Sequence, residues 1–130
     1  MPPRLFSLDE ALRLLPVVRR LLSEIRDARD EVARRSAELD QLLGRTGGNG
    51  HLAGQVEQAR TAVQEAITDA QRLIVELEEL GVELKGIDEG LVDFRSLRDG
   101  RTVYLCYRLG EDSIAYWHEL DTGFAGRQPL

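Results

Sequence analysis

The stretch LVDFRSLRDGRTVYLCYR, residues 91–108, decides the C-terminal half of the fold. Leu91–Leu97 and Thr102–Arg108 read as strands, in which successive side chains point to opposite faces. Between them stands Asp99-Gly100, a dipeptide that suits a type I′ hairpin turn because both residues tolerate a positive φ. The stretch therefore predicts a two-stranded antiparallel hairpin.

A third strand is predicted over Ser113–Leu120, after a two-residue turn at Gly110-Glu111. Val82–Lys85 reads as a short extended stretch ahead of the hairpin. We therefore expect a three-stranded antiparallel β-meander within residues 82–120, followed by a C-terminal tail over residues 121–130.

The two turns also predict which side chains share a face. With both turns tight, Cys106 lies opposite Asp93 on one side and Ala115 on the other. One extra turn residue would move the third strand's side chains to the opposite face. The polar face then carries Asp93, Arg95, Tyr104, Cys106, Trp117 and Glu119, and the apolar face, with His118 at its edge, packs on the helices.

The N-terminal part opens with a helix start signal. Ser7 followed three residues later by Glu10 is a capping box, which satisfies free backbone N–H groups at a helix N-terminus. A short helix over Leu8–Leu14 is expected next. Pro16 should end or kink it, because proline lacks the N–H, and it fits the first position of a second helix over Pro16–Leu43.

Residues 7–80 as a whole predict a long antiparallel helical hairpin that resembles a coiled coil. Apolar residues alternate steps of three and four from Leu21 to Leu42, where Arg35 is the one polar intrusion, and again from Val56 to Leu80. Residues 44–54 contain five glycines and predict a flexible tip, and Gly81 supplies the C-cap of the second helix.

The chain has 130 residues, 42% of them hydrophobic and 31% charged, which fits a single α+β domain over residues 1–130. The net charge of −6 argues against nucleic acid and membrane surfaces as partners. No apolar run is long enough to span a bilayer and no signal sequence is evident, so we expect a cytoplasmic protein. Cys106 is the only cysteine, which agrees with a reducing compartment.

A two-helix hairpin buries only one stripe of each helix. The remaining stripe includes Leu15, Val18 and Leu22 and needs a cover. We therefore expect a homodimer through the helices, because isologous pairing is the commonest way to bury a surplus apolar face.

Four residues carry donor atoms that suit zinc or another divalent ion: Cys106, His118, Glu119 and Asp93. Their spacing does not require a metal, since His118 follows the one cysteine by twelve residues and the predicted pairing puts the two on opposite faces. In the alternative interpretation no cofactor is required. Cys106 is then a small strand residue and His118 bonds a backbone carbonyl.

No residue is assigned a catalytic role, and an enzyme is disfavoured. A thiol beside Asp93 is a poor nucleophile, because the neighbouring carboxylate raises its pKa. The chain also contains no nucleophile elbow, phosphate-binding loop or metalloprotease helix.

A binding or assembly module is the function that the sequence favours. Arg95, Tyr104 and Trp117 form one predicted cross-strand row of residue types that are frequent at interaction hot spots. Arg127, in the tail segment Gly123–Arg127, offers a guanidinium and backbone N–H groups to an anion. The expected partner is a protein or a small anionic ligand, with divalent-metal binding as the alternative function.

The sequence resembles the small bacterial proteins grouped as domain of unknown function 2203. The resemblance spans nearly the whole chain, including Phe6–Ala11 and Leu14–Pro16. Its specific motifs are Gly90–Phe94, Tyr104–Tyr107, Gly110-Glu111, Tyr116–Glu119 and Gly123–Arg127. It implies no activity, substrate or partner, because none is established for the family. A proline often follows the family's Asp-Phe pair and a tryptophan its cysteine, where this chain has Arg95 and Tyr107.

Overall fold

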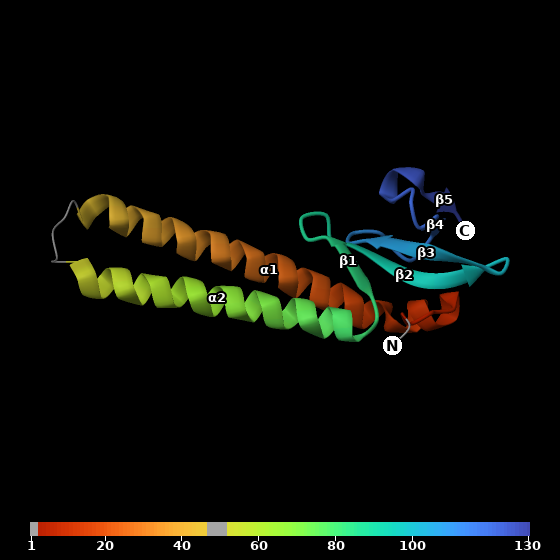
Figure 1. Ribbon diagram of the computed structural model, residues 1–130, viewed down its shortest axis with the longest axis horizontal. Helices are drawn as coiled ribbons and strands as arrows, with labels where there is room; N and C mark the ends of the chain where they lie inside the picture. The colour runs from red at the N-terminus through yellow and green to blue at the C-terminus, as the bar shows by residue number, and fades with distance from the viewer. Residues whose placement is uncertain (1–2, 47–51) are drawn as a thin grey trace.

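The computed structural model describes residues 3–46 and 52–130, and over these the chain is an α+β protein (Figure 1). Two long helices, α1 (Leu8–Thr46) and α2 (Ala53–Glu79), pack against each other as an antiparallel hairpin. A five-stranded antiparallel sheet follows and lies at one end of the hairpin (Figure 1). The predicted fold class is confirmed. Within the described residues, neither helix is long and apolar enough to cross a membrane.

The helix α1 begins at the predicted capping box. The Glu10 N–H donates to Ser7 Oγ over 3.1 Å, and the Ser7 N–H donates to the Glu10 carboxylate over 2.9 Å. The helix then continues through Pro16 for 39 residues, so the predicted break between a short and a long helix is wrong. Proline removes one backbone hydrogen bond, but a single buried stripe runs past it on both sides and keeps the helix in register. The stripe consists of Ala11, Leu15, Val18 and Leu22.

The hairpin is slightly longer than predicted at its far end. Gly44 and Gly54 belong to the helices, contrary to the prediction of a tip over residues 44–54. Glycine costs about 1 kcal/mol in a helix interior, a small penalty near the end of a long helix. The rest of that predicted tip, residues 47–51, lies outside the described residues. At the near end Gly81 has a φ of 90° and donates its N–H to the Glu78 carbonyl over 2.9 Å, as a C-cap glycine should.

The sheet has the strand order β1-β2-β3-β4-β5, with every neighbouring pair antiparallel. The three predicted strands correspond to β2, β3 and β4. The extended stretch ahead of them adds β1, and the C-terminal tail adds β5 after a short 3₁₀ turn, η2, so the meander has two strands more than predicted. The bounds are β1 (Glu83–Gly86), β2 (Leu91–Arg98), β3 (Arg101–Arg108), β4 (Tyr116–His118), η2 (Phe124–Gly126) and β5 (Gln128–Pro129).

The β2–β3 hairpin has the predicted turn and register. Asp99 and Gly100 have φ values of 53° and 76°, as a type I′ turn requires at its two central residues. Asp93 pairs with Cys106, and Arg95 pairs with Tyr104. This hairpin fixes the first two members of the polar cluster described below.

The β3–β4 register differs from the prediction by one residue. Cys106 pairs with Tyr116, where the sequence predicted Ala115. The turn closes from the Glu111 N–H to the Arg108 carbonyl at 3.0 Å, so Gly110, with φ 106°, is its third residue, and β4 begins only at Tyr116. Because side chains alternate, the shift turns every β4 side chain to the other face.

The core lies between the sheet and the near end of the hairpin. Apolar side chains of β2, β3 and β4 meet α1 there, and Trp117 belongs to this cluster, so it is not on the polar face as predicted. Most of the sheet's contribution comes from Val92, Phe94, Val103, Leu105, Tyr107 and Trp117.

The residues that argued for a dimer are covered within one chain. Leu15, Val18 and Leu22 are 4%, 0% and 1% exposed, and they belong to the same core cluster as the sheet. The stated reason for helical pairing is therefore wrong. The homodimer itself stays a prediction.

Candidate functional site

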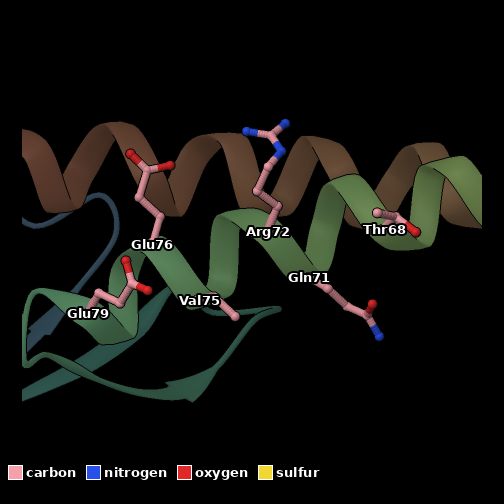
Figure 2. Close-up of a pocket in the computed structure, with 6 residues that line it drawn as sticks. All are labelled: Thr68, Gln71, Arg72, Val75, Glu76 and Glu79. Carbon is pink, nitrogen blue, oxygen red and sulfur yellow. The ribbon is translucent and has the colours of Figure 1, made fainter.

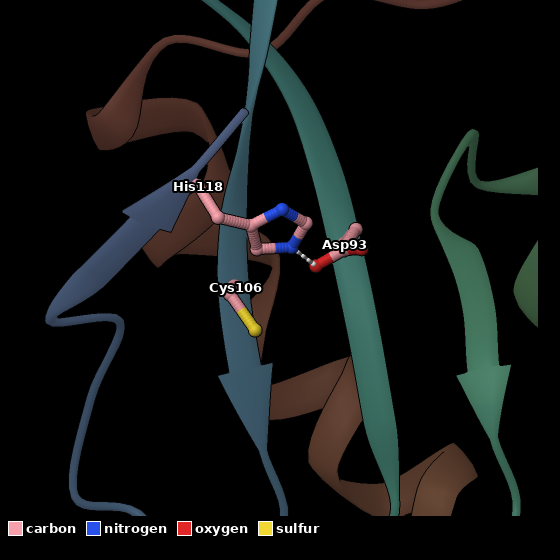
Figure 3. A group of neighbouring side chains, drawn as sticks. All are labelled: Asp93, Cys106 and His118. Carbon is pink, nitrogen blue, oxygen red and sulfur yellow. Dashed lines mark hydrogen bonds and ion pairs between the residues drawn. The ribbon is translucent and has the colours of Figure 1, made fainter. Parts of the chain in front are cut away.

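Three metal-ligating side chains meet on the sheet face that points away from the helices. Asp93, Cys106 and His118 come from β2, β3 and β4, and their ligand atoms all lie within 4.8 Å of one another (Figure 3). Their exposed fractions are 2%, 0% and 2%. Of the three polar or charged residues that are buried in the described chain, two belong to this cluster. The β4 shift is what brings His118 to the face of Cys106.

His118 is held at both ring nitrogens. Nε2 reaches across β3 and lies 3.0 Å from Asp93 Oδ1 (Figure 3). Nδ1 lies 2.7 Å from the Glu119 backbone carbonyl. Because a carbonyl oxygen only accepts hydrogen bonds, Nδ1 carries a proton and donates it. This leaves Nε2 as the nitrogen that faces Asp93 and Cys106. A histidine anchored to a backbone carbonyl in this way is typical of metal ligands.

Burial changes the acid–base properties of the other two residues. It raises the pKa of the Cys106 thiol to about 12, with a further contribution from the negative charge of Asp93. It also raises the pKa of Asp93, although His118, Cys106 and Lys85 act in the opposite direction. A thiol with so high a pKa is protonated at neutral pH, which makes Cys106 a poor nucleophile.

The cluster is covered on several sides by neighbouring side chains. The Tyr104 ring lies 5.3 Å from the His118 ring, and Tyr104 is 4% exposed. Near Cys106, the Arg127 guanidinium stacks 4.2 Å from the Tyr116 ring centroid and bonds both Glu111 and the Cys106 carbonyl. On the β1 side stands Lys85, whose Nζ is 3.9 Å from Asp93 Oδ2.

The fourth predicted metal ligand does not join the cluster. The Glu119 carboxylate binds Arg101 over 2.5 Å at the end of β4, and only the backbone carbonyl of Glu119 contacts His118. Side chains alternate along a strand, so the neighbour of a ligand points away from it. Three of the four residues named from the sequence therefore converge.

The predicted row of Arg95, Tyr104 and Trp117 is not formed. Trp117 pairs with Leu105 on the core face, so only the first two residues share the outer face. Arg95 binds Glu83 over 2.6 Å, and Tyr104 donates its hydroxyl to the same carboxylate over 2.9 Å. The predicted anion ligand Arg127 is also engaged, because it binds Glu111 over 2.7 Å.

A separate hollow lies on the surface of α2 (Figure 2). All of its lining side chains come from that one helix, so no second element closes over a ligand. It lies apart from the buried cluster and brings together no set of metal-ligating residues. Its lining residues are Thr68, Gln71, Arg72, Val75, Glu76 and Glu79.

The comparison with protein families agrees with the resemblance seen in the sequence. The profile of a family described as an uncharacterised conserved protein, DUF2203, matches residues 4–130. The chain belongs to the DUF2203 family. No curated protein and no solved structure matches it.

In this DUF2203 chain, sequence reasoning missed the role of β1. Glu83 and Lys85 stand beside the buried cluster, yet they were predicted only as part of a short extended stretch. The sequence holds one signal for Lys85, which is the only lysine among 17 lysine and arginine residues.

Proposed function

We propose that this protein binds a divalent transition-metal ion, zinc above all, through Asp93, Cys106 and His118. The observation that supports this most is the convergence of an oxygen, a sulfur and a nitrogen donor from three adjacent strands in a buried position. Buried polar groups need partners, and one metal ion would engage all three donors at once. Zinc accepts all three donor types.

The distances are compatible with such an ion. Zinc–ligand bonds of about 2.0–2.3 Å in tetrahedral geometry separate the ligand atoms by roughly 3.3–3.8 Å. The three ligand atoms lie within 4.8 Å of one another, so small side-chain rotations would bring them to those separations. Three protein ligands leave a fourth coordination position for water or another small ligand. No reaction is assigned to it.

Binding would stabilise the fold, because the site exists only when β2, β3 and β4 are paired. A ligand that binds the folded state alone adds about 2.7 kcal/mol at a concentration one hundred times its Kd. The metal must also displace the proton of Cys106, since a thiolate is the ligand form of cysteine, and the proton shared by His118 Nε2 and Asp93 Oδ1, which lie 3.0 Å apart. Affinity should therefore fall as the pH falls.

The test is a titration with Zn²⁺ and Co²⁺ of protein purified without chelators, followed by elemental analysis and native mass spectrometry. We expect about one ion per chain, an absorption band from cobalt–thiolate charge transfer, and a higher Tm. Cys106→Ser and His118→Asn should each weaken binding by about tenfold or more.

Glu119→Gln is the matched control. It changes the residue beside His118 but leaves the backbone carbonyl in place, so it should bind metal as the unaltered protein does. If a large excess of Zn²⁺ neither binds to the unaltered protein nor shifts its Tm, the proposal is wrong. The cluster would then be a metal-free hydrogen-bonded contact between strands.

Assembly through the hairpin is the second candidate function, with another copy of the chain as the partner. It is supported by apolar side chains that stay partly exposed at the far end of the hairpin. Val32 and Leu39 of α1 and Val56 and Val63 of α2 remain partly exposed along the helical seam, where the sheet does not reach. A second hairpin packed there would complete their burial. Sedimentation velocity at micromolar concentration tests this, and a monomer would contradict it.

A further inference from the structure

The rim of the buried cluster is most open along β1. The Lys85 and Glu83 side chains are 37% and 32% exposed, whereas the Arg127 side chain is 12% exposed and Tyr104 as a whole residue is 4% exposed. Beneath the cluster, Val92, Leu105 and Trp117 fill the space between the sheet and the helices. An ion that reaches Asp93 from solvent therefore meets the fewest obstacles at Lys85.

The amine of Lys85 already occupies the approach to the second carboxylate oxygen of Asp93. Asp93 Oδ1 is engaged by His118, and Asp93 Oδ2 faces Lys85 Nζ at 3.9 Å. Lys85 is the extra residue of a β-bulge, since Leu84 pairs with Val92 while Gly86 pairs with Leu91. Bulges are frequent next to functional sites, where they redirect a side chain.

Two other groups at the rim already hold Lys85, so it can move away from Asp93 without leaving the rim. Its Nζ lies 3.4 Å from Glu83 Oε1 and 4.3 Å from the centroid of the Tyr104 ring. Glu83 is itself fixed, because Arg95 and the Tyr104 hydroxyl both donate to its carboxylate. A short swing of a flexible lysine stem toward this pair would free Asp93.

We propose that Lys85 is a gate for the metal site: its ammonium group occupies the approach to Asp93, and an incoming cation must displace it. This inference rests on the proposed metal function and adds to it how access is controlled. A monovalent ammonium and a divalent ion repel each other strongly at a few ångströms in a buried site, so both cannot remain against Asp93. Lys85 thereby lowers metal affinity and slows metal entry.

Two variants of the full chain test the gate. Lys85→Met keeps the length of the side chain and removes its charge, and we expect Co²⁺ to bind about tenfold more tightly or better and to enter faster in stopped-flow absorbance. Lys85→Arg keeps the charge and is the matched control. It should bind Co²⁺ no more tightly than the unaltered protein.

The unaltered protein offers a second readout, because Lys85 is its only lysine. An amine-acylating reagent labels Lys85 and the α-amino group alone, so the second serves as an internal reference. If Zn²⁺ displaces Lys85 from Asp93, its labelling rate relative to the α-amino group should rise severalfold in mass spectrometry. If Lys85→Met fails to fold, this labelling experiment still tests the gate.

The failures of the two proposals are distinguishable. Absence of metal binding in both the unaltered protein and Lys85→Met would overturn the metal function, and with it the gate. Metal binding with equal affinity and equal entry rates in both proteins would overturn the gate and leave the site standing. Unchanged labelling of Lys85 on Zn²⁺ binding would also overturn the gate.

Discussion

Cys106 illustrates how much a single environment changes the chemistry of a side chain. As an isolated thiol it would be a moderate nucleophile, but burial and the charge of Asp93 raise its pKa to about 12. The same surroundings provide an oxygen and a nitrogen donor within 4.8 Å. The site therefore disfavours free-thiol chemistry, and in the proposed function a cation would have to displace the thiol proton.

The pKa of Cys106 predicts its reactivity toward alkylating reagents. At pH 8 only about one thiol in ten thousand is ionised when the pKa is about 12, so the folded, metal-free protein should react very slowly with iodoacetamide. The rate should rise about tenfold per pH unit, because the thiolate is the reactive form. Intact-mass spectrometry follows the reaction.

Protein in urea is the control for this experiment, since an exposed Cys106 has an ordinary pKa and should alkylate rapidly. Fast labelling of the folded protein at pH 8, comparable to that in urea, would show that the thiol is not buried as the structure has it.

At the scale of elements, the connection between β3 and β4 determines the face to which His118 points. Arg19 of α1 donates through Nε to the Tyr107 hydroxyl over 3.1 Å. It also donates to the backbone carbonyls of Glu111 and Asp112, and the Tyr107 hydroxyl donates to the first of these over 3.1 Å. Arg19 of α1 thus helps to fix the conformation of the connection that leads into β4.

Arg19→Met should therefore destabilise the protein by about 1–3 kcal/mol, because it removes the charged donor from the partly buried Glu111 carbonyl and Tyr107 hydroxyl. Urea denaturation measures the change. Metal affinity should fall as well, since a looser connection releases β4. Arg20→Met is the control: Arg20 is exposed and pairs with Glu24, so the expected change is below about 0.5 kcal/mol. Equal effects of the two substitutions would contradict the role of Arg19.

The same connection shows what sequence reasoning could and could not reach. Local chemistry predicted the capping box at Ser7 and the turn at Asp99-Gly100, because each depends on residues that are neighbours in the chain. Arg19 bonds the connection ahead of β4 although it lies 92 residues from Glu111, and no local pattern contains that contact. The sequence therefore identified His118 as a candidate ligand but placed it on the wrong face.

A related limit applies to the helix α1. Pro16 predicts a break when only the backbone is considered, whereas the sheet packed on Leu15 and Val18 favours a continuous helix. The sheet also covers the stripe that had argued for a dimer. In both cases tertiary packing outweighs a correct local rule.

At the scale of the whole molecule, the helical hairpin and the sheet divide the protein into a packed end and a projecting end (Figure 1). In the core cluster, α1 contributes residues between Ala11 and Ile25. The fully buried residue that α2 contributes is Leu77. In the described part of the hairpin beyond that cluster, only Ala66 is buried. The site and the core therefore do not depend on the far half of the hairpin.

Shortening the hairpin tests this division. Replacement of residues 33–65 by a short Gly-Ser loop should leave a folded protein that binds metal as tightly as the full chain, because the core cluster is untouched. Circular dichroism and Zn²⁺ titration measure both properties. If the full chain is a dimer through the hairpin, the shortened chain should be a monomer. A shortened chain that cannot fold would show that the far half contributes to the core.

The number of residues between β3 and β4, residues 109–115, limits how proteins with this site can vary in length. Because side chains alternate along β4, adding or removing one residue there would turn His118 toward the helices, whereas a change of two would return it to Asp93. Tolerance of insertions should therefore follow parity: even changes preserve the site and odd changes abolish it. In a natural variant with an odd change, a histidine one position earlier or later would restore the arrangement.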